Sequence, residues 1–201
     1  MTRLEQALAR LAIDLRNLEA RWALVGGLAV SARAEPRTTR DIDAAIAAST
    51  DAEAERLVRA LGDLGYRLLE QLENDVTGRL ATVRMLAPGE GETGGIVLDL
   101  FFDYSGLEEQ LIQRAEILAL VPGLEAPIAR LGDLLALKVL AARPRDREDA
   151  KVLLAKAKEE DLDLARDALQ ALGRLGVHRE ADYLEELQRL IAEQKADRFR
   201  G

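Results

Sequence analysis

The sequence predicts an α+β protein, and three observations favour this fold class. Leucines recur at intervals of three and four residues near the N-terminus, which is the spacing of an amphipathic helix. Short apolar runs bounded by glycine or polar residues follow up to about residue 102 and are typical of strands. Beyond Leu107 the helical spacing dominates again. We therefore expect a core of mixed sheet and flanking helices over residues 1–125, followed by a helical C-terminal region over residues 126–201.

Each element can be assigned from its local pattern. A helix is expected over residues 4–20, and the apolar run Trp22–Val25 is expected to be a strand that ends at the pair Gly26–Gly27. Further strands are predicted at 42–46, 66–71, 78–86 and 96–102, and helices at 28–33 and 52–63. The glycine-rich segment 88–95 is expected to form a turn or hairpin loop. The C-terminal pattern allows a short strand near 117–121 and predicts helices at 130–142, 147–158, 161–173 and 179–195.

The composition excludes several kinds of functional site. Aromatic residues make up only 3% of the 201 residues, so aromatic base-stacking surfaces are not expected. The chain has no cysteine, which excludes disulfides, thiolate zinc sites and cysteine nucleophiles. Its single histidine, His178, is too few for histidine-clustered metal sites and disfavours most serine–histidine hydrolase mechanisms. Carboxylates, lysines, arginines, hydroxyls and glycine loops remain for chemistry.

The charge and the hydropathy pattern constrain the location and partners of the protein. The net charge of −8 argues against a generally basic surface for nucleic acid. No apolar run is long enough to cross a bilayer, and the amphipathic N-terminus lacks the continuous apolar stretch of a signal peptide. We therefore expect a cytoplasmic protein with no membrane association.

Three carboxylates occupy strand positions where burial disfavours a charge. Asp41 and Asp43 are two residues apart, so on a strand their side chains point to the same face of the sheet. Asp99 interrupts the apolar run from Ile96 to Phe102. A buried carboxylate is costly unless it is paired, and neighbouring carboxylates repel each other unless a hard cation lies between them. These acids are therefore expected to bind Mg²⁺ or Mn²⁺, as carboxylates do in enzymes of phosphoryl and nucleotidyl transfer.

The pair Gly26–Gly27 lies between a predicted strand and a predicted helix. Glycine lets the backbone approach a phosphate closely, and amides at a helix start supply hydrogen-bond donors. Thirteen residues separate the pair from Asp41, which is room for one short helix that returns the chain to the neighbouring strand. An ordinary tight turn is the alternative interpretation.

Two segments together resemble a known superfamily. Val25-Gly26-Gly27-Leu28-Ala29 and Arg37-Thr38-Thr39-Arg40-Asp41-Ile42-Asp43 resemble the signature of the DNA polymerase β-like nucleotidyltransferases. The form Arg-x-Thr-x-Asp-x-Asp resembles the motif of the AbiEii-like branch, which includes toxins of type IV toxin–antitoxin pairs. The later segment Lys138–Asp149 is similar to the Lys-x4-Arg-x2-Asp-x2-Asp element of that branch. The resemblance implies a polymerase β-like nucleotidyltransferase core followed by the helical region.

The resemblance also implies catalytic roles for the three acids. In the superfamily the paired acids bind metal, which places that role on Asp41 and Asp43. The third strand acid, Asp99 here, completes the metal site and helps to deprotonate the attacking hydroxyl.

The nucleotide-binding roles follow from the same resemblance. The glycine turn, Gly26 and Gly27, would hold the triphosphate, with Arg37, Thr39 and Lys138 as further contacts. Many members have serine where this chain has Gly27, so backbone donors alone are expected at this position. Asp146 and Asp149 are expected to contact the residues that bind the nucleotide and not the nucleotide itself.

The same residues also allow structural interpretations. Asp41 and Asp43 are compatible with a solvated edge strand, and Asp99 with a strand end near the surface. Lys138 lies among leucines, so its stem could pack on apolar surface while its ammonium extends into water. Asp146 also fits the N-cap of a helix, and for Asp149 both interpretations stay open.

A local excess of basic residues lies between residues 130 and 158. The segment contains eight lysines and arginines and four acidic residues, which gives it a local charge of +4 in a chain of net charge −8. This segment is compatible with binding a triphosphate or an RNA backbone. The alternative is a set of ion pairs on helix surfaces.

These observations favour a Mg²⁺-dependent nucleotidyltransferase. An acceptor hydroxyl would attack the α-phosphate of a nucleoside triphosphate, and the acceptor implied by the resemblance is RNA, such as a tRNA 3′ end, or a protein hydroxyl. The resemblance also implies a toxin with an antitoxin protein as partner. Two alternatives stay open: transfer to a small molecule such as an aminoglycoside, and a non-catalytic module of the same fold that binds a nucleotide or a partner.

Overall fold

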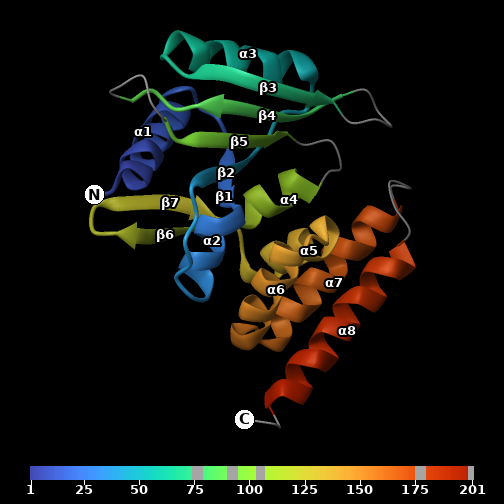
Figure 1. The fold of residues 1–201 in the computed structure, drawn as a ribbon. Coiled ribbons are helices and arrows are strands. Elements are labelled where there is room, and N and C mark those ends of the chain that lie inside the picture. Colours follow the sequence, from blue (N-terminus) through green and yellow to red (C-terminus); the bar gives the residue numbers. More distant parts are fainter. Residues whose placement is uncertain (74–78, 90–94, 103–106, 175–179, 199–201) are drawn as a thin grey trace. The chain divides into compact units, whose positions relative to one another are not determined.

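A mixed sheet organises the N-terminal two thirds of the chain. The computed structural model describes residues 1–73, 79–89, 95–102, 107–174 and 180–198. In these ranges seven strands pair in the order β3-β4-β5-β2-β1-β7-β6 (Figure 1). β2 pairs with β5 and β1 pairs with β7 in parallel, and the other neighbours are antiparallel. The α+β class with a mixed sheet is confirmed.

The strands and helices of this part have the following bounds. The strands are β1 (Trp22–Val25), β2 (Asp41–Ile46), β3 (Arg67–Glu73), β4 (Leu80–Leu86), β5 (Val97–Phe102), β6 (Glu116–Val121) and β7 (Leu124–Ile128). The helices are α1 (Arg3–Asn17), α2 (Gly26–Arg33), α3 (Asp51–Asp63) and α4 (Leu107–Arg114). α1 packs against β2 and β7, α3 against β3 and β4, and α4 against β1 and β2.

One strand was not expected from the sequence. β7 lies where we predicted no strand, although buried Leu124, Ala126 and Ile128 alternate with less buried residues at the period of a strand. The run is only five residues long and contains Pro127, and it becomes a strand by pairing with β1 and β6. Part of the predicted loop 88–95, the start of the predicted strand 78–86, residue 179 and His178 lie outside the described residues.

Burial of apolar side chains explains why α1 is fixed to the sheet. Leu8, Leu11 and Leu15 lie on one face of α1 and are almost completely buried. Asp14 on the same helix is also buried, and its carboxylate accepts hydrogen bonds from the Tyr66 hydroxyl at 2.9 Å and from Arg10 Nε at 2.6 Å. Burial and the Asp14 carboxylate raise the pKa of the Tyr66 hydroxyl far above its usual value. The pair therefore links α1 to the chain just before β3.

The chain divides into two compact units. The first unit comprises residues 1–28 and 37–129 and contains the sheet. The second comprises residues 29–36 and 130–201, so the segment Ala29–Pro36 joins the C-terminal helices. Our expectation from the sequence placed a division after residue 125.

The second unit is built around α5 (Leu131–Ala141), with α6 (Pro144–Lys156), α7 (Glu159–Arg174) and α8 (Glu180–Arg198) packed on one another and on α5. α5 is apolar on nearly all sides, as expected of a helix enclosed by others. It ends at Ala142, whose φ of 51° is left-handed, and Pro144 then starts α6 at a position where no backbone donor is required. None of the helices in the described residues is both long and apolar enough to span a membrane.

Close packing of α5 against α7 depends on Gly132. A Cβ atom at this position would collide with the backbone oxygen of Asp161 and would lie 2.8 Å from Leu164 Cβ. Neither atom can move without shifting the backbone of α7, so the position requires glycine.

We expect Gly132→Ala to lower the free energy of unfolding by about 2 kcal/mol, because the added methyl group separates two packed helices. Gly62→Ala on α3 is the matched control, since nothing lies within 4 Å of a Cβ atom there. The control is expected to stabilise the protein by up to about 1 kcal/mol through helix propensity. Urea unfolding followed by circular dichroism measures both values, and equal stability of the two variants would contradict this packing argument.

Candidate active site

The chain passes from β1 into α2 through a glycine pair that touches Asp43. Gly26 has a φ of 60°, a conformation that strains other residues, and a Cβ atom there would overlap the Asp43 carboxylate. The backbone N–H of Gly27 donates to Asp43 Oδ2 at 3.3 Å. α2 begins at Gly26 itself, so the predicted turn is compressed into this one residue. The close approach of Asp43 explains why glycine is required.

Two side chains converge on Gly27 from the segment that precedes β2. A Cβ atom at Gly27 would lie 2.7 Å from Arg37 Nη2 and 2.8 Å from Thr39 Oγ1. Thr39 Oγ1 also donates to the backbone oxygen of Asp41 at 3.5 Å. A guanidinium and a hydroxyl therefore occupy the space that a serine side chain at position 27 would need.

The strand register aligns the acidic residues on one face of the sheet. Asp43 on β2 lies directly opposite Asp99 on β5, and Asp41 is two residues before Asp43 on the same face. Asp41 is exposed and Asp43 is half-buried, whereas Asp99 is only 8% exposed. β2 lies between β5 and β1, so the interpretation of Asp41 and Asp43 as edge-strand residues is wrong. Asp99 likewise lies within β5 and is buried.

Asp99 is held by an arginine that the sequence analysis did not identify. Arg84 on β4 lies opposite Asp99, and its Nε and Nη2 donate to Asp99 Oδ1 and Oδ2 at 2.8 and 2.9 Å. These hydrogen bonds and the charge of Asp99 raise the pKa of the Arg84 guanidinium, with further contributions from Glu70 and Asp41. Arg84 is a charged residue in the largely apolar strand β4, as Asp99 is in β5. Two opposite charges in neighbouring apolar strands could have predicted this pair.

The acids fit a divalent cation only in part. The oxygen ligands of Asp41 and Asp43 suit Mg²⁺ or Mn²⁺. Both oxygens of Asp99, however, are engaged by Arg84. Across the described ranges no group of three or more acidic or histidine side chains has the arrangement of a metal site. The structure thus brings the three predicted acids together but offers two of them to a cation.

Lys138 forms a buried cluster with two aspartates in the second unit. Its ammonium lies 2.9 Å from Asp146 Oδ1 and 2.9 Å from Asp149 Oδ2, and its side chain is 11% exposed. The ammonium does not extend into water, so the interpretation as a solvated lysine is wrong. Asp146 Oδ2 is buried and accepts no hydrogen bond from the described residues.

Asp146 does not cap α6. The N-cap is Arg143, with no side-chain cap, and Asp146 lies in the first turn. Pro144 fixes the helix start three residues earlier than the predicted start at residue 147, and a carboxylate in the first turn still interacts favourably with the helix dipole. The N-cap prediction for Asp146 is therefore wrong.

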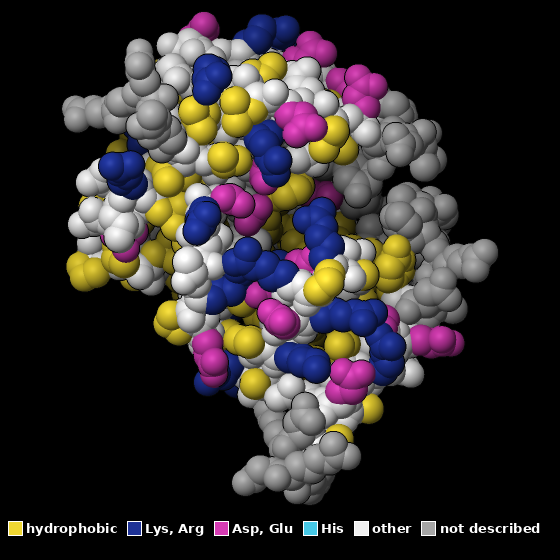
Figure 2. All heavy atoms as spheres, in the orientation of Figure 1, with side chains coloured by type: hydrophobic (Ala, Val, Ile, Leu, Met, Phe, Trp, Pro, Cys, Tyr) yellow, Lys and Arg dark blue, Asp and Glu magenta, His cyan; other side chains and the backbone are white. Residues whose placement is uncertain are grey.

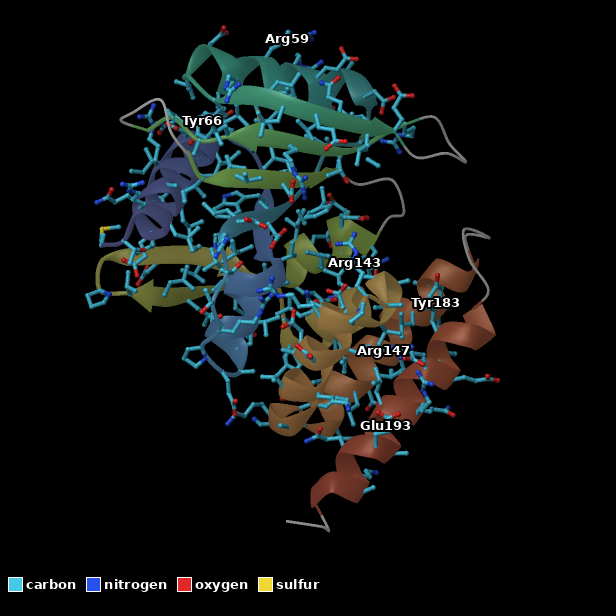
Figure 3. All side chains as sticks on the ribbon, viewed as in Figure 1. Arg59, Tyr66, Arg143, Arg147, Tyr183 and Glu193 are labelled. Atoms are coloured by element: carbon cyan, nitrogen blue, oxygen red, sulfur yellow. The ribbon has the colours of Figure 1, made fainter. Side chains whose placement is uncertain are left out.

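The basic segment 130–158 is largely neutralised within its own unit. Arg147 pairs with Glu186 at 3.4 Å, Lys151 with Glu193 at 3.6 Å, and Lys156 with Glu35 at 3.8 Å. Figure 2 shows basic and acidic side chains interspersed over these helices, and Figure 3 labels Arg147 on α6 and Glu193 on α8. These contacts favour the interpretation as helix-surface ion pairs.

The fold is similar to that of solved nucleotidyltransferases. The crystal structure of an antigenic nucleotidyltransferase-like protein from Paracoccidioides brasiliensis matches over 92% of both chains, with 19% identity and a TM-score of 0.54. ANT(2″)-Ia in complex with adenylyl-2″-tobramycin matches with 16% identity and a TM-score of 0.49, over 94% of this chain and 99% of that chain. The lincomycin-bound lincosamide antibiotic adenylyltransferase LnuA matches with 15% identity and a TM-score of 0.46, over 76% of this chain and 98% of that chain.

A protein family matches the sequence over nearly its whole length. None of the curated protein sequences matches the chain. The family described as "Nucleotidyl transferase AbiEii toxin, Type IV TA system" matches residues 6–201. This match covers more than half of the chain and shows that the chain belongs to the AbiEii nucleotidyltransferases.

Proposed function

We propose that this chain transfers a nucleoside monophosphate from a nucleoside triphosphate to a hydroxyl group of RNA. The hydroxyl oxygen forms a bond to the α-phosphorus, the bond from that phosphorus to the bridging oxygen breaks, and pyrophosphate leaves. The observation that carries the proposal is the alignment of Asp41, Asp43 and Asp99 on one face of the sheet beside the Gly26–Gly27 turn.

Asp41 and Asp43 are the residues that would hold a divalent cation, Mg²⁺ or Mn²⁺. Their spacing presents two carboxylates from one strand, and Asp41 is exposed to solvent. When bound, the cation would neutralise charge on the phosphate oxygens. Asp99 is the proposed third acid, which would accept the proton of the attacking hydroxyl or bind the cation.

The triphosphate would lie against the start of α2. Gly26 and Gly27 add no side chain of their own at this place, and the helix start contributes a favourable dipole. Arg37 and Thr39 border Gly27 closely and supply a cation and a hydroxyl. We assign both to phosphate binding, in place of the serine that many members carry.

Lys138 is the proposed additional phosphate contact, with Asp146 and Asp149 as the residues that orient it. An ammonium has three N–H donors, and the two aspartates accept at 2.9 Å each. One donor would then serve a phosphate oxygen. Lys138 also stabilises the second unit, because its ammonium offsets the charges of two buried carboxylates.

The acceptor and the partner follow from the family context. An AbiEii nucleotidyltransferase implies a nucleoside triphosphate as substrate and a toxin–antitoxin setting. We propose an RNA acceptor, with a tRNA 3′ end as the first candidate and a protein hydroxyl as the alternative to test beside it. The reaction would take place in the cytoplasm, and an antitoxin protein would oppose it.

A small hydroxylated cation such as an aminoglycoside is the second candidate acceptor. The observation that favours it is the internal pairing of the basic residues of α6, which leaves less positive charge for an RNA backbone. The net charge of −8 is compatible with a cationic acceptor.

Replacement of Asp41 and Asp43 by asparagine should lower transfer at least a thousandfold, which corresponds to about 4 kcal/mol of transition-state stabilisation. The assay incubates the protein with Mg²⁺, each α-labelled nucleoside triphosphate, and total tRNA, protein or aminoglycoside. Asp63→Asn removes one carboxylate from the exposed end of α3; it is the control for loss of a surface acid and should retain full transfer.

The label identifies the acceptor in the same assay. Label on tRNA supports the proposed acceptor, and label on an aminoglycoside moves the assignment to the second candidate. Triphosphate binding without transfer to any of the three acceptors would indicate a binding module and would contradict the proposed reaction.

Gly27→Ser should weaken triphosphate binding about tenfold, although serine is the residue that many members carry. Its side chain would displace Arg37 and Thr39, and contacts of this strength are worth roughly 1.5 kcal/mol. Gly27→Ala produces the same crowding without a hydroxyl and should behave alike. Calorimetric titration with ATP measures the three affinities. Tighter binding by the serine variant than by the wild type would contradict the assigned role of Arg37 and Thr39.

Lys138→Met should lower the free energy of unfolding by about 3 kcal/mol, because it leaves Asp146 and Asp149 buried without their cation. Lys151→Met is the control, since its pair with Glu193 is exposed and contributes less than about 1 kcal/mol. Urea unfolding gives both values. Unchanged stability of Lys138→Met would show that the two aspartates do not depend on this lysine.

A further inference from the structure

Arg84, which pairs with Asp99 in the first unit, has no role in the proposed reaction as described so far. Arg84 uses Nε and Nη2 for the two oxygens of Asp99, and its Nη1 lies 3.9 Å from Glu70 Oε2 on β3. The register places Glu70, Arg84, Asp99 and Asp43 in one row across β3, β4, β5 and β2. One guanidinium therefore lies in a row with three carboxylates.

The two partners differ in their freedom to move. The Asp99 side chain is 11% exposed, whereas that of Arg84 is 47% exposed. A buried carboxylate on a central strand cannot leave its place, but a half-exposed arginine can rotate toward water. Glu70, with a side chain that is 52% exposed, offers a second carboxylate beside the guanidinium.

Both oxygens of Asp99 are used in a bidentate pair, which is the strong form of a carboxylate–arginine contact. A divalent cation at the same carboxylate would lie close to the guanidinium, and the two positive charges would repel each other. Either the arginine or the cation can therefore compensate the charge of Asp99, but binding of both at once is unfavourable.

We propose that Arg84 is an internal counter-ion that competes with the divalent cation for Asp99, and that Glu70 receives its guanidinium when the cation binds. This inference rests on the proposed function, since it concerns the cation of the same acids. Arg84 is a positioning residue: without cation it compensates the buried charge of Asp99, and its release completes the three-acid site.

The test measures binding of Mn²⁺ alone, without nucleotide, to the full chain by the paramagnetic resonance signal of free Mn²⁺. We expect Arg84→Met to bind Mn²⁺ about tenfold more tightly than the wild type, because the competing charge is gone. Arg67→Met removes the same charge from an exposed position on β3 and should change the affinity less than about twofold. The double variant Arg84→Met/Asp99→Asn should lose the gain. Equal or weaker binding by Arg84→Met would overturn the inference.

A second pair of variants tests the role of Glu70. Glu70→Gln removes the carboxylate that would receive the released guanidinium, whereas Glu73→Gln removes the same charge from the same strand. We expect the first variant to bind Mn²⁺ about threefold more weakly than the second. Equal affinities would overturn the assignment of Glu70.

Arg84→Met leaves a buried carboxylate without its partner and is expected to be less stable than the wild type in EDTA. Mn²⁺ should therefore raise its thermal midpoint more than that of the wild type. If this variant does not fold, Arg84→Lys keeps the charge without the two-pronged contact and should bind Mn²⁺ about threefold more tightly than the wild type. Unchanged affinity of a folded Arg84→Lys would then overturn the inference.

The variant Asp41→Asn/Asp43→Asn separates the two proposals. If it abolishes Mn²⁺ binding while Arg84→Met binds no more tightly than the wild type, the inference fails and the proposed cation site stands. If it binds Mn²⁺ as the wild type does, the proposed cation site fails.

Discussion

Two carboxylates on adjacent strands, Asp43 and Asp99, lie opposite each other because β2 and β5 pair in parallel with this register. Like charges at this spacing destabilise a sheet unless each is compensated. The backbone N–H of Gly27 donates to Asp43, and the guanidinium of Arg84 pairs with Asp99. These two contacts offset the repulsion between the neighbouring carboxylates of Asp43 and Asp99.

The glycine turn is part of the same compensation. Gly26 permits the Asp43 carboxylate to approach the backbone, and Gly27 leaves the space that Arg37 and Thr39 occupy. The short helix α2 therefore starts against the Asp43 carboxylate of β2, with the Arg37 guanidinium and the Thr39 hydroxyl beside Gly27. A nucleotide with its own negative charge would require such donors beside the acids, together with a cation between acid and phosphate.

The second unit also contains buried charged side chains, and they pair with one another. Lys138, Asp146 and Asp149 are all buried or nearly so, and the ammonium offsets the charge of the two carboxylates. The left-handed Ala142 and Pro144 set the corner between α5 and α6 that brings them together. The surrounding basic residues pair with glutamates of other segments, so charge in this unit is balanced locally.

The sequence by itself determined the local properties of this protein: the α+β class, most strands and helices, the glycine pair and the three acids. These follow from side-chain periodicity and from charges placed in apolar runs, which are visible over a few residues. The tertiary structure alone decided which groups compensate those charges. Arg84 meets Asp99 through the register of β4 on β5, Arg37 and Thr39 meet Gly27 across a loop, and Lys138 meets two aspartates across a helix corner. Strand pairing and helix packing bring together residues that are distant in the chain, so a pattern over a few residues does not predict these contacts.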